Sequence, residues 1–124
     1  MSNLLIISAT NDNNLDLSEK LQSFLVELGI ESNIVSLENF DFPLFGGKAD
    51  VDDSIIRNFV DNLSKANGFI FCAPEYNGGV PPVLSNAITW VTVKTPGWRD
   101  AFVGKFALIA TASGGQGYRF LTAF

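Results

Sequence analysis

Three short segments rich in glycine, asparagine and hydroxyl side chains are the parts of this chain best suited to bind a ligand. Each follows an apolar run typical of a buried strand, and they span residues 8–16, 74–79 and 112–117. Backbone N–H groups, hydroxyls and carboxamides can hydrogen-bond a polar ligand, and glycine allows close approach to the backbone. The candidate binding residues are Ser8, Thr10, Asn13, Asn14, Pro74, Glu75, Tyr76, Asn77, Gly78, Ser113, Gly114, Gly115 and Gly117.

The segment 74–79 is the most specific of the three. Its proline and glycines are turn-forming residues, and N–H groups from about residue 76 to residue 79 can face the polar edge of a ligand. Tyr76 offers a flat aromatic face, and Asn77 can both donate and accept hydrogen bonds. The alternative interpretation is a rigid turn between a strand and a helix, in which Asn and Gly serve backbone geometry alone.

A scaffold must bring the three segments together, and the hydrophobic pattern predicts one. Short apolar runs predict strands at residues 4–7, 30–35, 69–72 and 106–111. Helical spacing of apolar residues follows the strands, and strands alternating with helices are typical of a parallel, doubly wound α/β sheet. Because ligands bind at the carboxyl edge of such a sheet, the three segments are expected to form one concave rim there.

The helices are predicted from their apolar faces and their end signals. The first would end at Gly29, the second would follow three aspartates at residues 50–53, and the third would begin at Pro81-Pro82. Residues 37–49 and 93–104 are expected to be loops, and another helix begins at about residue 118. The predicted apolar face of the first helix consists of Leu17, Leu21, Phe24, Leu25 and Leu28.

A longer, gapless pattern extends the central segment. Pro-Glu-Tyr-Asn-Gly-Gly at 74–79 is followed by Pro-x-x-Leu-x-Asn-Ala-Ile-x-Trp at 81–90. This pattern resembles the signature of the NAD(P)H-dependent FMN reductase family, flavodoxin-like enzymes that include quinone, azo-dye and chromate reductases. The resemblance implies bound FMN, and hydride transfer from NAD(P)H through FMN to a quinone, azo compound, free flavin or other small acceptor. It also implies a homodimer or homotetramer.

The same resemblance predicts a flavodoxin-like strand order of 2-1-3-4. The family's domain continues through a further strand and helix that are absent from these 124 residues. We therefore expect a single domain, residues 1–124, that is either truncated at its C-terminus or has an edge covered by another chain.

The resemblance also assigns parts of the flavin to the segments. The amides of 74–79 would hold the carbonyl and nitrogen groups of the pyrimidine ring, and 112–117 would lie beside the dimethylbenzene and ribityl portions. Pro81 and Pro82 each remove an N–H group from the first turn of their helix. The phosphate is therefore expected at the first segment, where a helix begins without proline.

The first segment departs from the family pattern. Ala9-Thr10 stands where the family has Gly-Ser, the usual arginine is missing, and Asp12 and Asp16 bring negative charge toward a phosphate site. The alternative interpretation is an Asn/Asp-rich solvent loop in which Asp16 caps the helix.

Composition and charge exclude several classes of function. The net charge of −5 and the dispersed cations argue against nucleic-acid binding. Neither a signal-peptide pattern nor an apolar run of membrane length is apparent, and a single cysteine fits a reducing compartment, so a cytoplasmic location is expected without membrane contact. Since the chain has no histidine, catalytic triads and His-based metal sites are excluded, and no metal is expected. Cys72 is predicted to be a small buried hydrophobe rather than a redox residue.

Two other functions stay open at the level of the sequence. A flavodoxin-like electron carrier would bind FMN without using NAD(P)H, and a flavin-free remnant would bind none. Hydride transfer requires geometry and electrostatics rather than a protein acid or base, so no catalytic side chain is named. The helix with Trp90 and Val91 would suit pairing between subunits; alternatively, this face covers the chain's own sheet.

Overall fold

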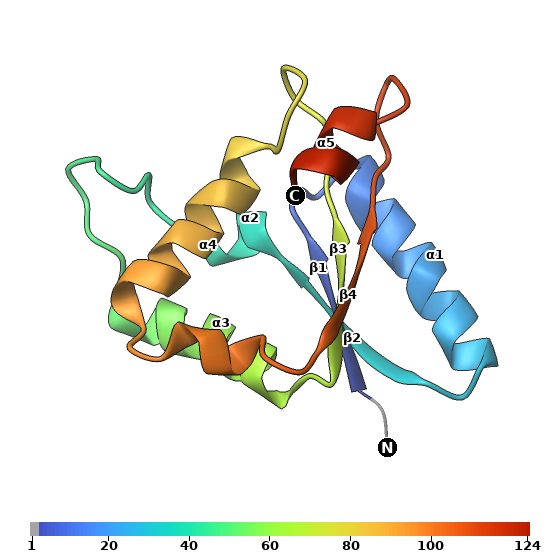
Figure 1. Ribbon diagram of the computed structural model, residues 1–124, viewed down its shortest axis with the longest axis horizontal. Helices are drawn as coiled ribbons and strands as arrows, with labels where there is room; N and C mark the ends of the chain where they lie inside the picture. The colour runs from blue at the N-terminus through green and yellow to red at the C-terminus, as the bar shows by residue number, and fades with distance from the viewer. Residues whose placement is uncertain (1–2) are drawn as a thin grey trace.

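Four parallel strands form a single sheet in the computed structural model, which describes residues 3–124 (Figure 1). The strands run in the order β2-β1-β3-β4, which confirms the predicted flavodoxin-like arrangement. Their bounds are Asn3–Ser8 for β1, Glu31–Ser36 for β2, Gly68–Cys72 for β3 and Phe106–Ala110 for β4.

Helices cover both faces of this sheet. Figure 1 shows α1 on one face, α3 and α4 on the other, and α5 above the carboxyl ends of the strands. The helices are α1 at Asn13–Glu27, α2 at Leu37–Phe40, α3 at Asp53–Lys65, α4 at Pro82–Lys94 and α5 at Tyr118–Ala123, with a 3₁₀ helix, η1, at Trp98–Ala101. None of the helices within residues 3–124 is long and apolar enough to cross a bilayer.

The two segments expected to be loops contain short helices. Residues 37–49 begin with α2, which ends where Asp41 adopts the left-handed conformation at φ 53°. Phe40 at the end of α2 packs against the buried Phe59 of α3, with ring centroids 5.1 Å apart. Residues 93–104 contain the last two residues of α4, Val93 and Lys94, and then η1. Packing of aromatic side chains, which the local pattern does not encode, accounts for the order in the first of these segments.

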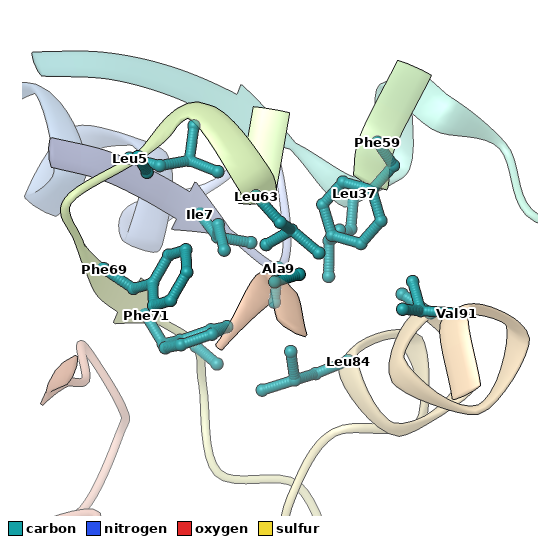
Figure 2. Packing of buried hydrophobic residues seen from close by; sticks show 14 of the residues in the cluster. Leu5, Ile7, Ala9, Leu37, Phe59, Leu63, Phe69, Phe71, Leu84 and Val91 are labelled. Atoms are coloured by element: carbon teal, nitrogen blue, oxygen red, sulfur yellow. The ribbon is translucent and has the colours of Figure 1, made fainter. Parts of the chain in front are cut away.

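The core alternates along the strands as the pleat requires. Leu5 and Ile7 of β1 and Phe69 and Phe71 of β3 point toward α3 and α4, where they meet residues such as Phe59 (Figure 2). A second cluster lies on the α1 face and consists of Ile6, Ile70 and Cys72, with Leu17, Leu21 and Leu25 packed against it.

The apolar face predicted for α1 is only partly buried. Phe24 is 60% exposed and Leu28 is 72% exposed, so these two residues of the predicted face are not buried in the core. The period of the helix places them near Leu21, but no other element of residues 3–124 covers that part of the face.

Strand β4 is one of the two edges of the sheet, opposite β2, and it carries exposed apolar side chains. Phe106 is 90% exposed and Leu108 is 54% exposed, which agrees with the expectation of an uncovered edge. A groove of about 450 Å³ lies beside it, between β3, β4 and Leu25 of α1.

Substitutions of the buried Phe59 and the exposed Phe106 test whether the core lies where the structure places it. Phe59→Ala removes a side chain with no exposed surface, and we expect it to lower the free energy of unfolding by about 3–5 kcal/mol. Phe106→Thr keeps a β-branched residue at an exposed strand position, so its effect should stay within about 0.5 kcal/mol. Urea unfolding followed by circular dichroism measures both. Comparable losses for the two variants would contradict the described core.

Candidate functional site

The three predicted segments meet at the carboxyl edge of the sheet. They surround a cavity of about 190 Å³ between the ends of β1, β3 and β4. A larger cavity of about 500 Å³ lies at the opposite end of the strands, beside Asn3 and Ser32. We consider the smaller one the candidate site, because ligands of open α/β sheets bind at the carboxyl edge.

Most of the predicted residues line this cavity. Those that do are Thr10, Asn13, Asn14, Pro74, Glu75, Tyr76, Ser113 and Gly114. Those that do not are Ser8, Asn77, Gly78, Gly115 and Gly117. Two lining residues, Asp12 and Ala112, were not among the candidate binding residues, although Asp12 was expected to bring negative charge toward the phosphate site. Both residues lie within the predicted segments, and this position was the sequence feature that could have identified them. Ala112 has no polar side chain that would indicate ligand binding.

The first segment leads into α1 with unpaired backbone donors. Within residues 3–124 the N–H groups of Asn13 and Asn14 make no hydrogen bond, as is usual for the first turn of a helix. Asp12 precedes the helix, and its carboxylate makes no capping hydrogen bond. Asp16 lies in the first turn, so the alternative in which it caps the helix is wrong. The segment therefore combines free N–H donors with an exposed negative charge.

Ser8 serves the framework of the first segment. Its hydroxyl is fully buried and donates a hydrogen bond of 2.6 Å to the carbonyl of Thr10. This pairing satisfies a buried polar group and shapes the chain where it leaves β1. The side chain of Ser8 thus has a partner within the segment and does not reach the cavity.

The central segment is a tight turn whose conformation explains its composition. Asn77 and Gly78 have φ values of 52° and 73°, and the N–H of Gly79 donates to the carbonyl of Tyr76 at 3.0 Å. Two successive left-handed residues are typical of type I′ turns, for which Asn-Gly is the preferred pair. The N–H of Gly79 is consequently used within the turn, contrary to the expectation that it faces a ligand. Tyr76 stays 47% exposed beside the cavity.

Glu75 joins the central segment to the last helix. Its Oε1 accepts hydrogen bonds from the N–H groups of Arg119 and Phe120, at 2.8 and 3.0 Å. Its own N–H donates to the hydroxyl of Ser113 at 3.0 Å. The carboxylate therefore caps α5, a role that the sequence pattern did not reveal because the partners lie 44 and 45 residues away.

Asn14 joins the first segment to the third. Its Nδ2 donates to the carbonyl of Ala112 at 3.0 Å, and its Oδ1 accepts from the N–H of the same residue at 2.9 Å. The side chain is 2% exposed. The three segments are thus connected to one another by side-chain hydrogen bonds as well as by the sheet.

Cys72 lies beneath the cavity rather than in it. The residue is 1% exposed and packs with Ile6 and Ile70 on the α1 face of the sheet. Burial raises the pKa of its thiol, although a hydrogen bond with Ser18 acts in the opposite direction. A raised pKa disfavours the reactive thiolate, and the prediction of a buried hydrophobe is confirmed.

Trp90 and Val91 are buried within the chain itself. The indole N–H of Trp90 donates to the carbonyl of Pro43 at 2.6 Å, and the ring of Phe45 packs on the indole edge-on with centroids 5.0 Å apart. Asn86, another residue of the signature, donates to the same carbonyl at 3.0 Å. Trp90 thus packs against residues 43–45 rather than against the sheet. Val91 belongs to the core cluster that contains Leu5 and Phe71, so the alternative that this face covers the chain's own sheet holds for Val91.

The strand order and the polar rim at the carboxyl edge define a flavodoxin-like protein. The model of the family described as NADPH-dependent FMN reductase matches residues 2–122. The chain belongs to this family, which confirms the resemblance found in the signature at 74–90.

Individual relatives are similar over part of their length. A protein of Lactobacillus johnsonii named NADH-dependent flavin reductase subunit 2 is 33% identical over 88 residues, which is 70% of this chain and 47% of the relative. A probable NADPH:quinone oxidoreductase 2 of Oryza sativa subsp. japonica is 34% identical over 80 residues, covering 62% of this chain and 37% of the relative. The chain thus spans about half, or less, of these relatives.

Solved structures share the fold at low sequence identity. FerB, a flavoenzyme NAD(P)H:(acceptor) oxidoreductase from Paracoccus denitrificans, superimposes with a TM-score of 0.72 at 20% identity, over 96% of this chain and 65% of FerB. The apo form of the NADH:FMN oxidoreductase EMOB gives a TM-score of 0.71 at 18% identity, over 95% and 62%.

Gly117 tests how tightly the third segment is built. Its φ is 71°, and a Cβ there would lie 2.5 Å from Cγ2 of Thr111. Gly117→Ala should therefore lower the free energy of unfolding by about 2 kcal/mol, from left-handed strain together with the clash. The matched control is Gly115→Ala, because a Cβ at Gly115 meets nothing within 4 Å. Urea unfolding compares the variants, and an equal effect of both would contradict the described loop.

Proposed function

We propose that this chain forms the flavin-binding part of an oxidoreductase that binds FMN non-covalently and uses NAD(P)H to reduce a small acceptor. A quinone, an azo compound or free flavin would be the class of acceptor. The observation that carries the proposal is the meeting of three polar segments around one cavity, in a chain that belongs to the NADPH-dependent FMN reductase family. The relatives named as flavin and quinone reductases support the same class of reaction.

The residues around the cavity fit the polar parts of FMN. The free N–H groups of Asn13 and Asn14 and the hydroxyl of Thr10 are donors suited to a phosphate at the start of a helix. The cavity of about 190 Å³ is smaller than the roughly 300–1,000 Å³ of typical ligand pockets, so it would enclose one part of the nucleotide. The exposed ring of Tyr76 would provide an apolar surface at its border.

The protein's own contribution would be binding and orientation. FMN supplies the ability to accept hydride and to pass electrons on. Fixed N–H donors around the cavity would stabilise negative charge on the ligand without rearranging. The chain has no histidine and its cysteine is buried, so we assign no catalytic side chain and propose that geometry and electrostatics suffice.

We also propose a cytoplasmic location, in keeping with the single reduced cysteine. A homodimer or homotetramer, if formed, would use a surface other than the covered face of Trp90, because that face packs against residues 43–45 of the same chain.

Binding and turnover by the 124-residue chain test the proposed function. Titration with FMN should quench flavin fluorescence, and the complex should oxidise NAD(P)H when a quinone is added, followed by the loss of NAD(P)H absorbance. A protein that binds FMN and leaves NAD(P)H unchanged would be an electron carrier instead. A protein that binds no FMN would be a flavin-free remnant, and either result would overturn the proposal.

The charge of Asp12 gives a second prediction about the phosphate. The residue lines the cavity, and its carboxylate makes no capping hydrogen bond to the helix. Its negative charge would repel a phosphate dianion bound there. Asp12→Asn should tighten FMN binding by roughly fivefold, since unit charges about 4 Å apart interact by about 1 kcal/mol in water. Riboflavin, which has no phosphate, should bind both proteins equally well.

Two comparisons make the Asp12 experiment specific. Asp16→Asn removes a neighbouring charge that does not line the cavity, so it should change the ratio of FMN to riboflavin affinity less. Added salt should reduce the difference between wild type and Asp12→Asn, because the exposed charge is screened. An equal gain for FMN and riboflavin would show that Asp12 does not act through the phosphate.

A further inference from the structure

Asn14 is the most buried polar side chain in the wall of the cavity. It is 2% exposed, and both ends of its carboxamide bond to one residue, Ala112, which lies 98 positions further along the chain. The carboxamide of Asn14 thus both donates to and accepts from the backbone of Ala112, as a peptide group of a neighbouring strand would. With its oxygen and one N–H group committed, the carboxamide is better placed to hold the protein together than to contact a ligand.

The two partners come from two different segments that line the cavity. Asn13 and Asn14 form the wall at the start of α1, and Ala112 and Ser113 form the wall after β4. The hydrogen bonds at 2.9 and 3.0 Å therefore fix the separation of these walls. Beyond Ala112, the hydroxyl of Ser113 bonds to the N–H of Glu75, so the third segment is held from both sides.

We propose that Asn14 is a positioning residue that sets the width of the flavin pocket by pairing with Ala112, rather than a group that binds the flavin. The inference rests on the proposed function for its ligand, and on the two hydrogen bonds for its mechanism. Loss of the carboxamide leaves the N–H and carbonyl of Ala112 without their partner, so the segment 111–117 becomes mobile and the donors of the cavity lose their fixed arrangement.

A matched control exists elsewhere in the chain. Asn86 makes the same kind of two-ended bridge, accepting from the N–H of Phe45 at 2.8 Å and donating to the carbonyl of Pro43 at 3.0 Å. Neither Asn86 nor its partners line the candidate cavity. Asn86→Ala therefore removes two hydrogen bonds of the same kind without touching the site, although the carbonyl of Pro43 keeps the indole N–H of Trp90 as a partner.

The experiment compares Asn14→Ala and Asn86→Ala with wild type. We expect Asn14→Ala to lower the melting temperature by an amount on the order of 5 °C. The loss in Asn86→Ala should be smaller, because the N–H of Phe45 is exposed to water and the carbonyl of Pro43 keeps the indole N–H of Trp90. At a temperature where all three proteins are folded, Asn14→Ala should weaken FMN binding by roughly tenfold or more, and Asn86→Ala by less than about twofold. Hydrogen–deuterium exchange without flavin should become faster in residues 111–117 of Asn14→Ala alone.

A milder variant covers the case in which Asn14→Ala does not fold. Asn14→Asp keeps an acceptor for the N–H of Ala112 and loses the donor to its carbonyl. Because this variant adds a negative charge that would repel the phosphate of FMN, its affinity is measured with riboflavin. The affinity for riboflavin should fall measurably, but by less than tenfold. Exchange in residues 111–117 should increase in the same variant.

The possible outcomes separate the two proposals. If wild type binds no flavin, the proposed function fails, and exchange in residues 111–117 then decides whether Asn14 holds this segment. If wild type binds FMN and Asn14→Ala binds it equally well, or no worse than Asn86→Ala, the positioning role is overturned. Unchanged exchange in residues 111–117 of both Asn14 variants overturns it as well.

Discussion

Parallel pairing of β1, β3 and β4 is the constraint on which the candidate site depends. Ser8, Cys72 and Ala110 stand in register at the ends of these strands. The ladder continues one residue further, because the N–H of Ala9 donates to the carbonyl of Cys72 at 2.9 Å and that of Ala73 to the carbonyl of Ala110 at 3.2 Å. The three segments therefore leave the sheet at the same level, which brings chemically similar loops together from distant parts of the chain.

Several polar side chains at the carboxyl edge of the sheet form hydrogen bonds within the chain. Asn14 bridges to Ala112, and Glu75 bridges to Ser113 and α5. Buried polar groups require partners, so residues that look like ligand donors in the sequence are partly used for construction. The donors free to meet a ligand are mainly backbone N–H groups at the start of α1, whose direction the helix fixes.

The residues of the family signature likewise have two roles: some form the turn beside the cavity, and others hold the fold together. Its first part forms the left-handed turn at Asn77 and Gly78, next to the cavity. Its second part, Asn86 and Trp90, holds the segment of Pro43 against α4, and none of these residues lines the candidate cavity. A signature can therefore identify a family although only some of its residues line the candidate cavity.

The sequence alone determined the strands, the main helices, the strand order implied by the resemblance, and the three segments that meet at one edge. Hydrophobic periodicity and turn residues are local properties, so a linear reading can detect them. Only the tertiary structure decided that Phe24 and Leu28 stay exposed, that Glu75 caps α5, and that Asn14 pairs with Ala112. The partner of a buried polar group, or the element that covers an apolar face, comes from a distant part of the chain, and spacing within one segment carries no information about it.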